Sequence, residues 1–218
     1  MIFGKIEYLN LLPFHIFMKR YIKGSSAKMA MEYKKNVPSY INKEFVNLRV
    51  DAAFISSAVA KKYPNVALGI IAKKEVLSVL VIPSKDQKED SDSATSNLLA
   101  KVLQQHGEVL IGDKALRYAL QNPNYIDLAQ LWHERTKLPF VFALLCFHTN
   151  PKKYQKITKL FTQKKYKIPQ YILKQRAKES NIAPKDILHY LDLISYKLDQ
   201  KALLGLKKFY KQINALNH

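Results

Sequence analysis

The sequence has a single cysteine, six glycines and no long uncharged apolar run among its 218 residues. One cysteine, Cys146, excludes an intramolecular disulfide, which fits a reducing compartment. A membrane-spanning helix needs about 20 apolar residues, and every apolar run here is shorter. The few glycines form no dinucleotide fingerprint or P-loop, and no His-Glu or Cys-His cluster offers metal ligands. We therefore expect no cofactor, no bound metal and no membrane partner.

Acidic residues are also scarce: 17 Asp and Glu stand against 36 Lys and Arg, a formal net charge of +19. Such an excess attracts nucleic acid, an acidic membrane surface or an anionic metabolite, unless it reflects a general basic bias. Many lysines of the last third recur at helical spacing, as on solvated helix faces: Lys152, Lys153, Lys156, Lys159, Lys164, Lys165 and Lys167. No zinc-finger, RNP-like or basic-heptad pattern occurs. The sequence favours a small anionic ligand over nucleic acid.

What the sequence does contain is the composition of a globular protein, 48% hydrophobic and 24% charged. Strand and helix patterns alternate through the first two thirds, which is typical of an α/β fold. The predicted strands lie at 1–8, 29–33, 50–56, 66–72 and 77–82, the predicted helices at 13–21, 40–47 and 93–105, and a loop at 84–93. Beyond Pro151 we predict helices only, the last over 200–214. The chain begins with a predicted strand rather than a signal peptide, so we expect a cytoplasmic protein.

The stretch 111–147 holds the most informative pattern. Gly112 and Asp113 directly follow the apolar end of a predicted strand, and the apolar run 138–147 predicts a strand buried on both faces. Cys146 lies inside that run, where an apolar setting disfavours a reactive thiolate, so we interpret it as a core residue. Proteins with α/β sheets bind ligands at the carboxyl edge of such strands. We therefore expect the site beside this stretch.

Polar residues stand at five predicted strand ends or helix starts. They are Tyr8 and Asn10; Ser56 and Ser57; Ser78; Ser93, Thr95 and Ser96; and Asp113. Each has a structural alternative, because asparagine suits a turn while serine, threonine and aspartate suit helix N-caps. Together they describe a pocket of hydroxyls, an amide and helix N-termini, which is suited to a carboxylate. His15, which follows the Asn10 turn, is the histidine best placed to act as a base.

Six groups of residues occur in a fixed order along almost the whole chain. They are Gly4-Lys5-Ile6 with Tyr8-Leu9-Asn10 and Pro13; Val37-Pro38-Ser39 with Val50 to Ser57; Ser78 to Ile82; Ser93 to Ser96; Ile111 to Leu116 with Asp127-Leu128, Trp132, Thr136 and Leu138 to Ala143; and Tyr190-Leu191 with Gly205 to Phe209. In that order they resemble the chorismate dehydratases of the futalosine route to menaquinone. The segment from Ile111 to Ala143 is the most specific. Lys137 stands where that family has glycine, and Leu145 where tryptophan is common.

The resemblance implies an α/β, two-lobed fold like that of type II periplasmic binding proteins, with two interlobe crossings and a helical C-terminal region. The crossings would lie near 77–83 and 140–147. Lobe 1 would comprise 1–80 and 146–218, and lobe 2 would comprise 81–145. The helices of 151–178 could pack on either lobe.

The resemblance also implies a hydro-lyase that converts chorismate to 3-[(1-carboxyvinyl)oxy]benzoate without a cofactor. Asn10 and Asp113 would be catalytic, and the substrate-binding residues would be Tyr8, Ser56, Ser57, Ser78, Ser93, Thr95 and Ser96. The base stays open among Asp113, His15 and the enolpyruvyl carboxylate of the substrate. Two alternatives are a cytoplasmic small-anion sensor with the same cleft and the related enzyme that forms 1,4-dihydroxy-6-naphthoate. The sequence predicts no oligomeric state.

Overall fold

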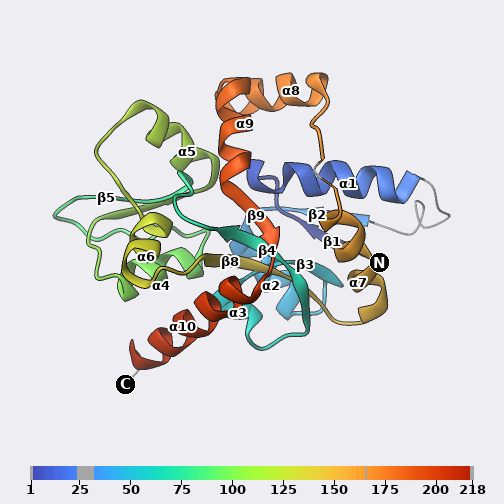
Figure 1. Cartoon of the computed structure of the whole chain (residues 1–218), viewed down its shortest axis with the longest axis horizontal. Helices are drawn as coiled ribbons and strands as arrows, with labels where there is room; N and C mark the ends of the chain where they lie inside the picture. The colour runs from blue at the N-terminus through green and yellow to red at the C-terminus, as the bar shows by residue number, and fades with distance from the viewer. Residues whose placement is uncertain (1, 24–31, 165, 217–218) are drawn as a thin grey trace.

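The computed structural model describes residues 2–23, 32–164 and 166–216. The chain forms two lobes, each built around its own β-sheet (Figure 1). The larger sheet has the strand order β2-β1-β3-β8-β4-β9, and the smaller has the order β6-β5-β7. The strands are β1 (Ile2–Lys5), β2 (Glu32–Lys35), β3 (Ala52–Ser56), β4 (Asn65–Ala72), β5 (Val79–Ile82), β6 (Glu108–Ile111), β7 (Ile126–Asp127), β8 (Phe140–Phe147) and β9 (Ile194–Lys197).

Helices connect the strands and cover the sheets. In chain order they are the 3₁₀ helix η1 (Leu9–Leu11), α1 (Leu12–Lys23), α2 (Pro38–Val46), α3 (Ser57–Ala60), α4 (Ala94–Val102), α5 (Gly112–Gln121), α6 (Leu128–Thr136), α7 (Pro151–Thr162), α8 (Gln170–Ser180), α9 (Pro184–Leu193) and α10 (Gln200–Leu216). The helices predicted at 13–21, 40–47 and 93–105 are thus confirmed as α1, α2 and α4. None of the described helices is both long and apolar enough to cross a bilayer.

The strand β8 occupies the centre of the larger sheet. It lies between β3 and β4 and pairs antiparallel with both, whereas β1 pairs parallel with β2 and β3. All of its residues are buried except the half-buried Phe142, which confirms the prediction of a strand buried on both faces. Cys146 is fully buried near its end, and burial raises the pKa of the thiol to about 12. The cysteine is therefore a core residue.

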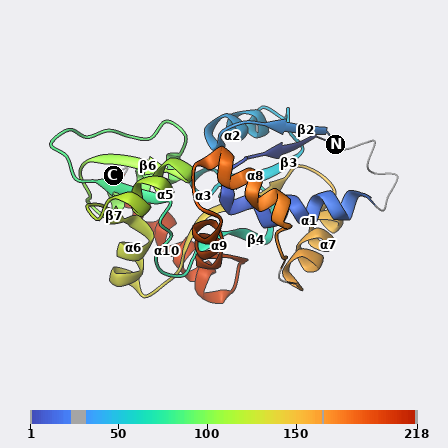
Figure 2. The same cartoon turned by 90° about the horizontal axis from the view of Figure 1, so that it is seen from above.

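The smaller lobe is inserted between β4 and β8. Its central strand β5 pairs antiparallel with β6 and β7. Figure 2 shows β6, β7, α5 and α6 on one side of the molecule and β1, β2, β3 and α1 on the other. All of β5 belongs to the smaller sheet and all of β8 to the larger. We therefore propose that the chain changes lobe at 73–78 and 137–139, a small shift from the predicted boundaries at 80 and 145.

The prediction that only helices follow Pro151 is wrong. The strand β9 lies between α9 and α10 and pairs antiparallel with β4 at the edge of the larger sheet. A strand of four residues, flanked by helices and paired with a segment far away in sequence, leaves little periodic pattern. The rest of the described chain after Pro151 is helical apart from its connections.

The helices α8 and α9 lie at the top of Figure 1, with α8 above α1 and α9 beside α5. On the smaller lobe, Arg117 of α5 donates through Nη1 to the carbonyl of Ser180 at 2.8 Å. On the larger lobe, the guanidinium of Arg176 lies 3.7 Å from the carboxylate of Glu7. The C-terminal region thus contacts both sides of the gap between the sheets.

Two predicted strands differ in their bounds. The first ends at Lys5 rather than at residue 8, because the chain turns there into η1. The second, predicted at 29–33, corresponds to β2; its residues 29–31, like Met1, lie outside the described part of the chain. Tyr8 therefore lies outside the strand, directly before η1, and Asn10 lies within η1, where the sequence predicted a turn.

Candidate functional site

A cavity lies between the lobes, and its walls come from both. The lining residues are Ile6, Tyr8, Asn10, Pro38, Phe54, Ser56, Ile70, Val76, Ser78, Val79, Ser93, Ser96, Ile111, Gly112, Phe142 and Ala143. They include six of the nine predicted site residues. None of these lining residues carries a formal charge, although the protein as a whole is strongly basic. Polar recognition in this cavity therefore depends on neutral groups and helix ends.

Asn10 presents an unpaired oxygen in this cavity. Its position is fixed from two sides: the Tyr196 hydroxyl donates to its main-chain carbonyl at 2.6 Å, and the N–H of the preceding Leu9 donates to Asp113 Oδ1 at 3.1 Å. The side-chain Oδ1 is buried and has no hydrogen-bond partner among the residues that the structure describes. A buried acceptor without a partner is costly, so this oxygen is available to a donor on a ligand.

Tyr8, which directly precedes η1, is packed against Gly112 at the start of α5. Gly112 has φ +67°, and a Cβ there would lie 2.8 Å from the Tyr8 ring, so the position requires glycine on both counts. The Tyr8 hydroxyl donates to Asp92 Oδ2 at 3.4 Å. Burial and the nearby carboxylates, Asp92 first, raise the pKa of Tyr8 above its usual value of 10. Tyr8 therefore stays neutral at physiological pH.

The start of α4 supplies hydroxyls and a helix N-terminus. Ser93 caps the helix, since its Oγ accepts from the Ser96 N–H at 3.2 Å, and the two side-chain oxygens are 2.8 Å apart. The turn before it is held by buried Asp90, which accepts from the Ile111 N–H at 3.2 Å and pairs with Lys114 at 2.7 Å. The prediction of Ser93 as an N-cap is confirmed, and its hydroxyl lines the cavity as well.

Thr95 connects the two lobes behind the cavity wall. Its Oγ1 accepts from the Ala58 N–H at 3.1 Å, lies 3.4 Å from Ser57 Oγ and contacts Ser56 Oγ at the N-terminus of α3. Ser57 is fully buried, and its carbonyl accepts from the Tyr210 hydroxyl at 2.9 Å. Of these residues only Ser56 lines the cavity. Ser57 and Thr95 instead hold α3 against α4.

The two candidate protein bases do not line the cavity. Asp113 lies in the first turn of α5, where the sequence favoured a cap for that helix, but its carboxylate bonds to Leu9 in η1. Burial raises the pKa of Asp113, and the bond to Leu9 opposes the rise. His15 Nε2 bonds to the Ile6 carbonyl at 2.9 Å. Burial, followed by the charges of Lys5 and Arg176, lowers the pKa of His15 to about 3, so the ring is neutral.

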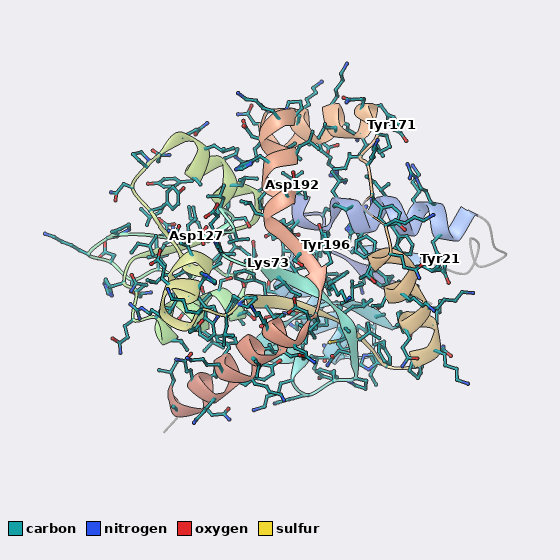
Figure 3. The ribbon with its side chains drawn as sticks, in the orientation of Figure 1. Tyr21, Lys73, Asp127, Tyr171, Asp192 and Tyr196 are labelled. Atoms are coloured by element: carbon teal, nitrogen blue, oxygen red, sulfur yellow. The ribbon has the colours of Figure 1, made fainter. Side chains whose placement is uncertain are left out.

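Sequence reasoning missed three residues that support the site. Tyr190 of α9 donates from its hydroxyl to Ser78 Oγ at 2.9 Å. Tyr196 bonds to Asn10, and Asp127 accepts four main-chain N–H groups, including those of Val76 and Leu77. Figure 3 shows Tyr196 near the centre of the molecule and Asp127 in the smaller lobe. The available signal was a tyrosine on an apolar helix face, whose buried hydroxyl requires a partner.

A larger hollow of about 720 Å³ has Tyr196 in its wall. Its walls include Lys164, Lys167 and Lys197, and none of the predicted site residues lines it. The interlobe cavity is much smaller, about 70 Å³, but two helix starts, the Asn10 oxygen and the hydroxyls converge there. We therefore take the interlobe cavity as the candidate site.

The structure resembles solved structures of low sequence identity. A protein from Archaeoglobus fulgidus is 14% identical with a TM-score of 0.72, covering 99% of this chain and 97% of that one. The periplasmic aliphatic sulphonate binding protein of Escherichia coli is 12% identical with a TM-score of 0.60, covering 100% and 87%. These likenesses concern the fold alone. They confirm the predicted α/β fold of the periplasmic-binding-protein type.

Sequence comparison identifies the family. A family model described as menaquinone biosynthesis matches residues 1–108 and 103–215. A chorismate dehydratase of Campylobacter jejuni is 51% identical over 221 residues, covering 100% of this chain and 99% of the relative. A chorismate dehydratase of Thermus thermophilus is 23% identical, covering 95% and 93%. The chain therefore belongs to the menaquinone-biosynthesis family that contains the chorismate dehydratases.

Proposed function

We propose that this protein removes water from chorismate to give 3-[(1-carboxyvinyl)oxy]benzoate. The observation that carries the proposal is the interlobe cavity, in which an unpaired amide oxygen of Asn10 stands among hydroxyls and helix N-termini. Chorismate has a ring hydroxyl to donate to such an oxygen, and two carboxylates to accept from N–H and O–H groups. The same donor and acceptor pattern fits this substrate better than a metal or a nucleotide.

The carboxylates would be held by neutral donors. Ser56, Ser93 and Ser96 line the cavity with hydroxyl side chains, and Ser93 and Ser96 place the N-terminus of α4 at its wall. The dipole of α4 adds positive potential at the same point. Donors fixed in advance of the reaction stabilise developing negative charge without reorganisation, which is where most of the rate enhancement in such sites originates.

The reaction itself is a redox-neutral elimination. The ring carbon that carries the enol ether loses its proton, and the negative charge spreads through the diene to the ring carboxylate. The hydroxyl on the neighbouring ring carbon then leaves as hydroxide, which combines with the proton as water, and the ring becomes aromatic. Asn10 Oδ1 is placed to orient that hydroxyl. No oxidant or reductant enters the balance, so the proposal requires no cofactor.

We propose that the substrate's own enolpyruvyl carboxylate takes the proton. The residues lining the cavity include no Asp, Glu, His or Lys to do so. Asp113 is engaged with the Leu9 N–H, and His15 with the Ile6 carbonyl. Asp113 therefore acts on this proposal as a residue that holds η1 and Asn10 in place, rather than as the base.

The proposal is tested by incubating the purified protein with chorismate. Loss of the diene absorbance together with a new aromatic product of the expected mass supports it, and equal rates with and without EDTA support the absence of a metal. Binding of chorismate without conversion supports the small-anion sensor instead. If the protein neither binds nor converts chorismate but does convert the later cyclic intermediate of the route, the naphthoate-forming alternative is supported. Because a dianion does not cross a bilayer unaided, we also propose that the protein acts in the cytoplasm.

A further inference from the structure

A buried tyrosine joins two of the cavity residues from behind. The Tyr190 hydroxyl donates to Ser78 Oγ at 2.9 Å, and the side-chain amide of Asn10 lies near the same hydroxyl, where it acts to lower the pKa of Tyr190. Tyr190 is 1% exposed and is not among the residues that line the cavity. It therefore contacts two residues that face a ligand without reaching the ligand itself.

The hydroxyl of Tyr190 determines which side of the Asn10 amide suits it. A phenol oxygen has one proton to donate and lone pairs to accept. Because its proton goes to Ser78 Oγ at 2.9 Å, the favourable neighbour on its other side is the amide N–H group of Asn10, and a nearby donor lowers the pKa of a phenol. The planar amide of Asn10 is then oriented with Oδ1 on the other side, where that atom is buried and unpaired. Ser78, which accepts from Tyr190, keeps its own proton for another acceptor.

Two further features keep this arrangement in one state. Tyr196 donates to the main-chain carbonyl of Asn10 at 2.6 Å, so the backbone of η1 is held as well. Burial raises the pKa of Tyr190 above its usual value of 10, and the neighbouring Ser78 and Asn10 side chains oppose this rise only in part. Burial also raises the pKa of Tyr196. Both hydroxyls are therefore protonated and able to donate at physiological pH.

We propose that Tyr190 is a positioning residue that orients Asn10 as a hydrogen-bond acceptor and Ser78 as a hydrogen-bond donor toward the substrate. The inference rests on the proposed function, because chorismate supplies the hydroxyl that Asn10 would accept and the carboxylate or ether oxygen that Ser78 would meet. Without the phenol hydroxyl, the Asn10 amide is free to turn by 180°. Its N–H group, a donor, would then face the substrate hydroxyl, which is also to donate, and the hydrogen bond would be lost.

The test is Tyr190→Phe, which removes only the hydroxyl. We expect kcat on chorismate to fall by about tenfold to a hundredfold, the range of a lost orienting contact, while circular dichroism shows a folded protein. Tyr166→Phe is the matched control. It removes a tyrosine hydroxyl that bonds to the Leu160 carbonyl at 3.2 Å away from the cavity, and we expect its kcat to stay within twofold of the wild-type value.

A double-mutant cycle separates positioning from a general structural role. If Tyr190 acts through Asn10 and Ser78, the loss caused by Tyr190→Phe must shrink in the Asn10→Ala background and in the Ser78→Ala background. A purely structural role would give the same fold-loss in every background. If Tyr190→Phe does not fold, the cycle between Asn10→Ala and Ser78→Ala replaces it: losses that simply multiply overturn the inference, and losses that overlap support it.

The outcomes also distinguish the inference from the function on which it rests. Wild-type protein that does not convert chorismate overturns the proposed function and this inference with it. Wild-type protein that converts chorismate, together with a Tyr190→Phe variant within twofold of it in kcat, overturns the inference and leaves the function standing.

Discussion

At the scale of the residue, Asn10 combines two properties that a purely structural asparagine would not have. Its main-chain carbonyl is held by Tyr196, yet its side-chain Oδ1 is a buried acceptor to which none of the described residues donates. Leaving such an atom unpaired costs about 1–3 kcal/mol of folding free energy. Asn97 shows the contrast, since its Oδ1 accepts from the Asp90 N–H at 3.0 Å and its Nδ2 donates to the Asp90 carbonyl at 2.8 Å.

Asn10→Ala is therefore expected to lower activity without lowering stability. The change removes an unsatisfied buried oxygen, so the free energy of unfolding should stay unchanged or rise by about 1 kcal/mol. Turnover of chorismate should fall by about tenfold or more, because the departing hydroxyl loses its partner. Urea denaturation and steady-state kinetics measure the two effects. Asn97→Ala is the control: its free energy of unfolding should fall, while its turnover of chorismate should stay close to that of the wild type. Unchanged kinetics in Asn10→Ala would remove this residue from the site.

Asp113 allows a direct test of the base. Asp113→Asn keeps an acceptor for the Leu9 N–H but cannot take a proton, whereas Asp113→Ala removes the acceptor as well. If Asp113 only holds η1, the Asn variant should keep turnover within about tenfold of wild type and the Ala variant should lose more. A general base contributes about 10²–10⁴-fold. Loss of that size in both variants, measured as kcat, would make Asp113 the base.

His15 makes a pH-dependent contribution to stability. Its pKa is about 3 in the folded protein, below its usual value of 6.5, because burial disfavours the charged ring. The unfolded chain therefore binds a proton that the folded chain does not, and stability declines as pH falls from 6.5 toward 3. At pH 5.5 the loss from this residue is about 1.4 kcal/mol.

Replacing this histidine isolates the effect. His15→Gln is expected to reduce the difference between the unfolding free energies at pH 7.5 and pH 5.5 by about 1 kcal/mol, measured by urea denaturation. His106→Gln, at an exposed position, serves as the control. An unchanged pH dependence in His15→Gln would show that the ring is protonated or exposed in the folded state.

At the scale of the element, the sequence predicted those helices and strands whose structure depends on neighbouring residues of the chain. The apolar run of β8 and the serine cap of α4 were both predicted, because burial on two faces and N-capping leave marks in consecutive residues. The strand β9 was missed because its pairing with β4 is remote in sequence. The bond from Leu9 to Asp113 was missed for the same reason: the partner of the carboxylate lies in another element.

One departure from the family has a local structural cost. Lys137, which stands where the resembling family has glycine, ends α6 in the left-handed region with φ +59°. Its N–H donates to the His133 carbonyl at 2.7 Å, so the conformation is set by the helix end. A residue with a Cβ pays about 1–2 kcal/mol for this backbone conformation, whereas glycine adopts it freely.

Lys137→Gly should therefore stabilise the protein. We expect a gain of about 0.5–1 kcal/mol in the free energy of unfolding, since glycine also loses more backbone entropy on folding. Lys156→Gly, within α7, is the matched control and should cost about 1 kcal/mol. Thermal and urea unfolding of the three proteins measure the differences. Destabilisation of Lys137→Gly would indicate that the lysine side chain makes a contact worth more than the relief of its backbone.

At the scale of the whole molecule, the sequence brings the candidate site together but does not assign a role to each of its residues. Six of the polar residues predicted from strand ends and helix starts line the interlobe cavity. Which of them face the cavity depends on contacts between the lobes. Thr95 and Ser57 are turned toward each other across α3 and α4, and Tyr190 reaches Ser78 from α9. These contacts join segments far apart in the chain, so no local pattern encodes them.

The contrast between the surface and the cavity leads to a prediction about salt. The net charge of the protein is +19, but the residues that line the cavity are uncharged. A dianionic substrate must therefore be attracted by basic residues outside the cavity and by helix N-termini. Such long-range attraction is screened when the Debye length falls from about 10 Å at 0.1 M salt to about 3 Å at 1 M.

We expect the KM for chorismate to rise by about threefold or more between 0.02 M and 0.5 M sodium chloride, with kcat nearly constant. The reason is that salt screens the approach of the substrate but not the neutral hydrogen bonds that act once it is bound. Initial rates across the salt series measure both constants, with sucrose at matched osmolarity as the control. A flat KM would mean that the basic surface plays no part in substrate capture, and that the hydroxyls and helix N-termini of the cavity supply all of the attraction.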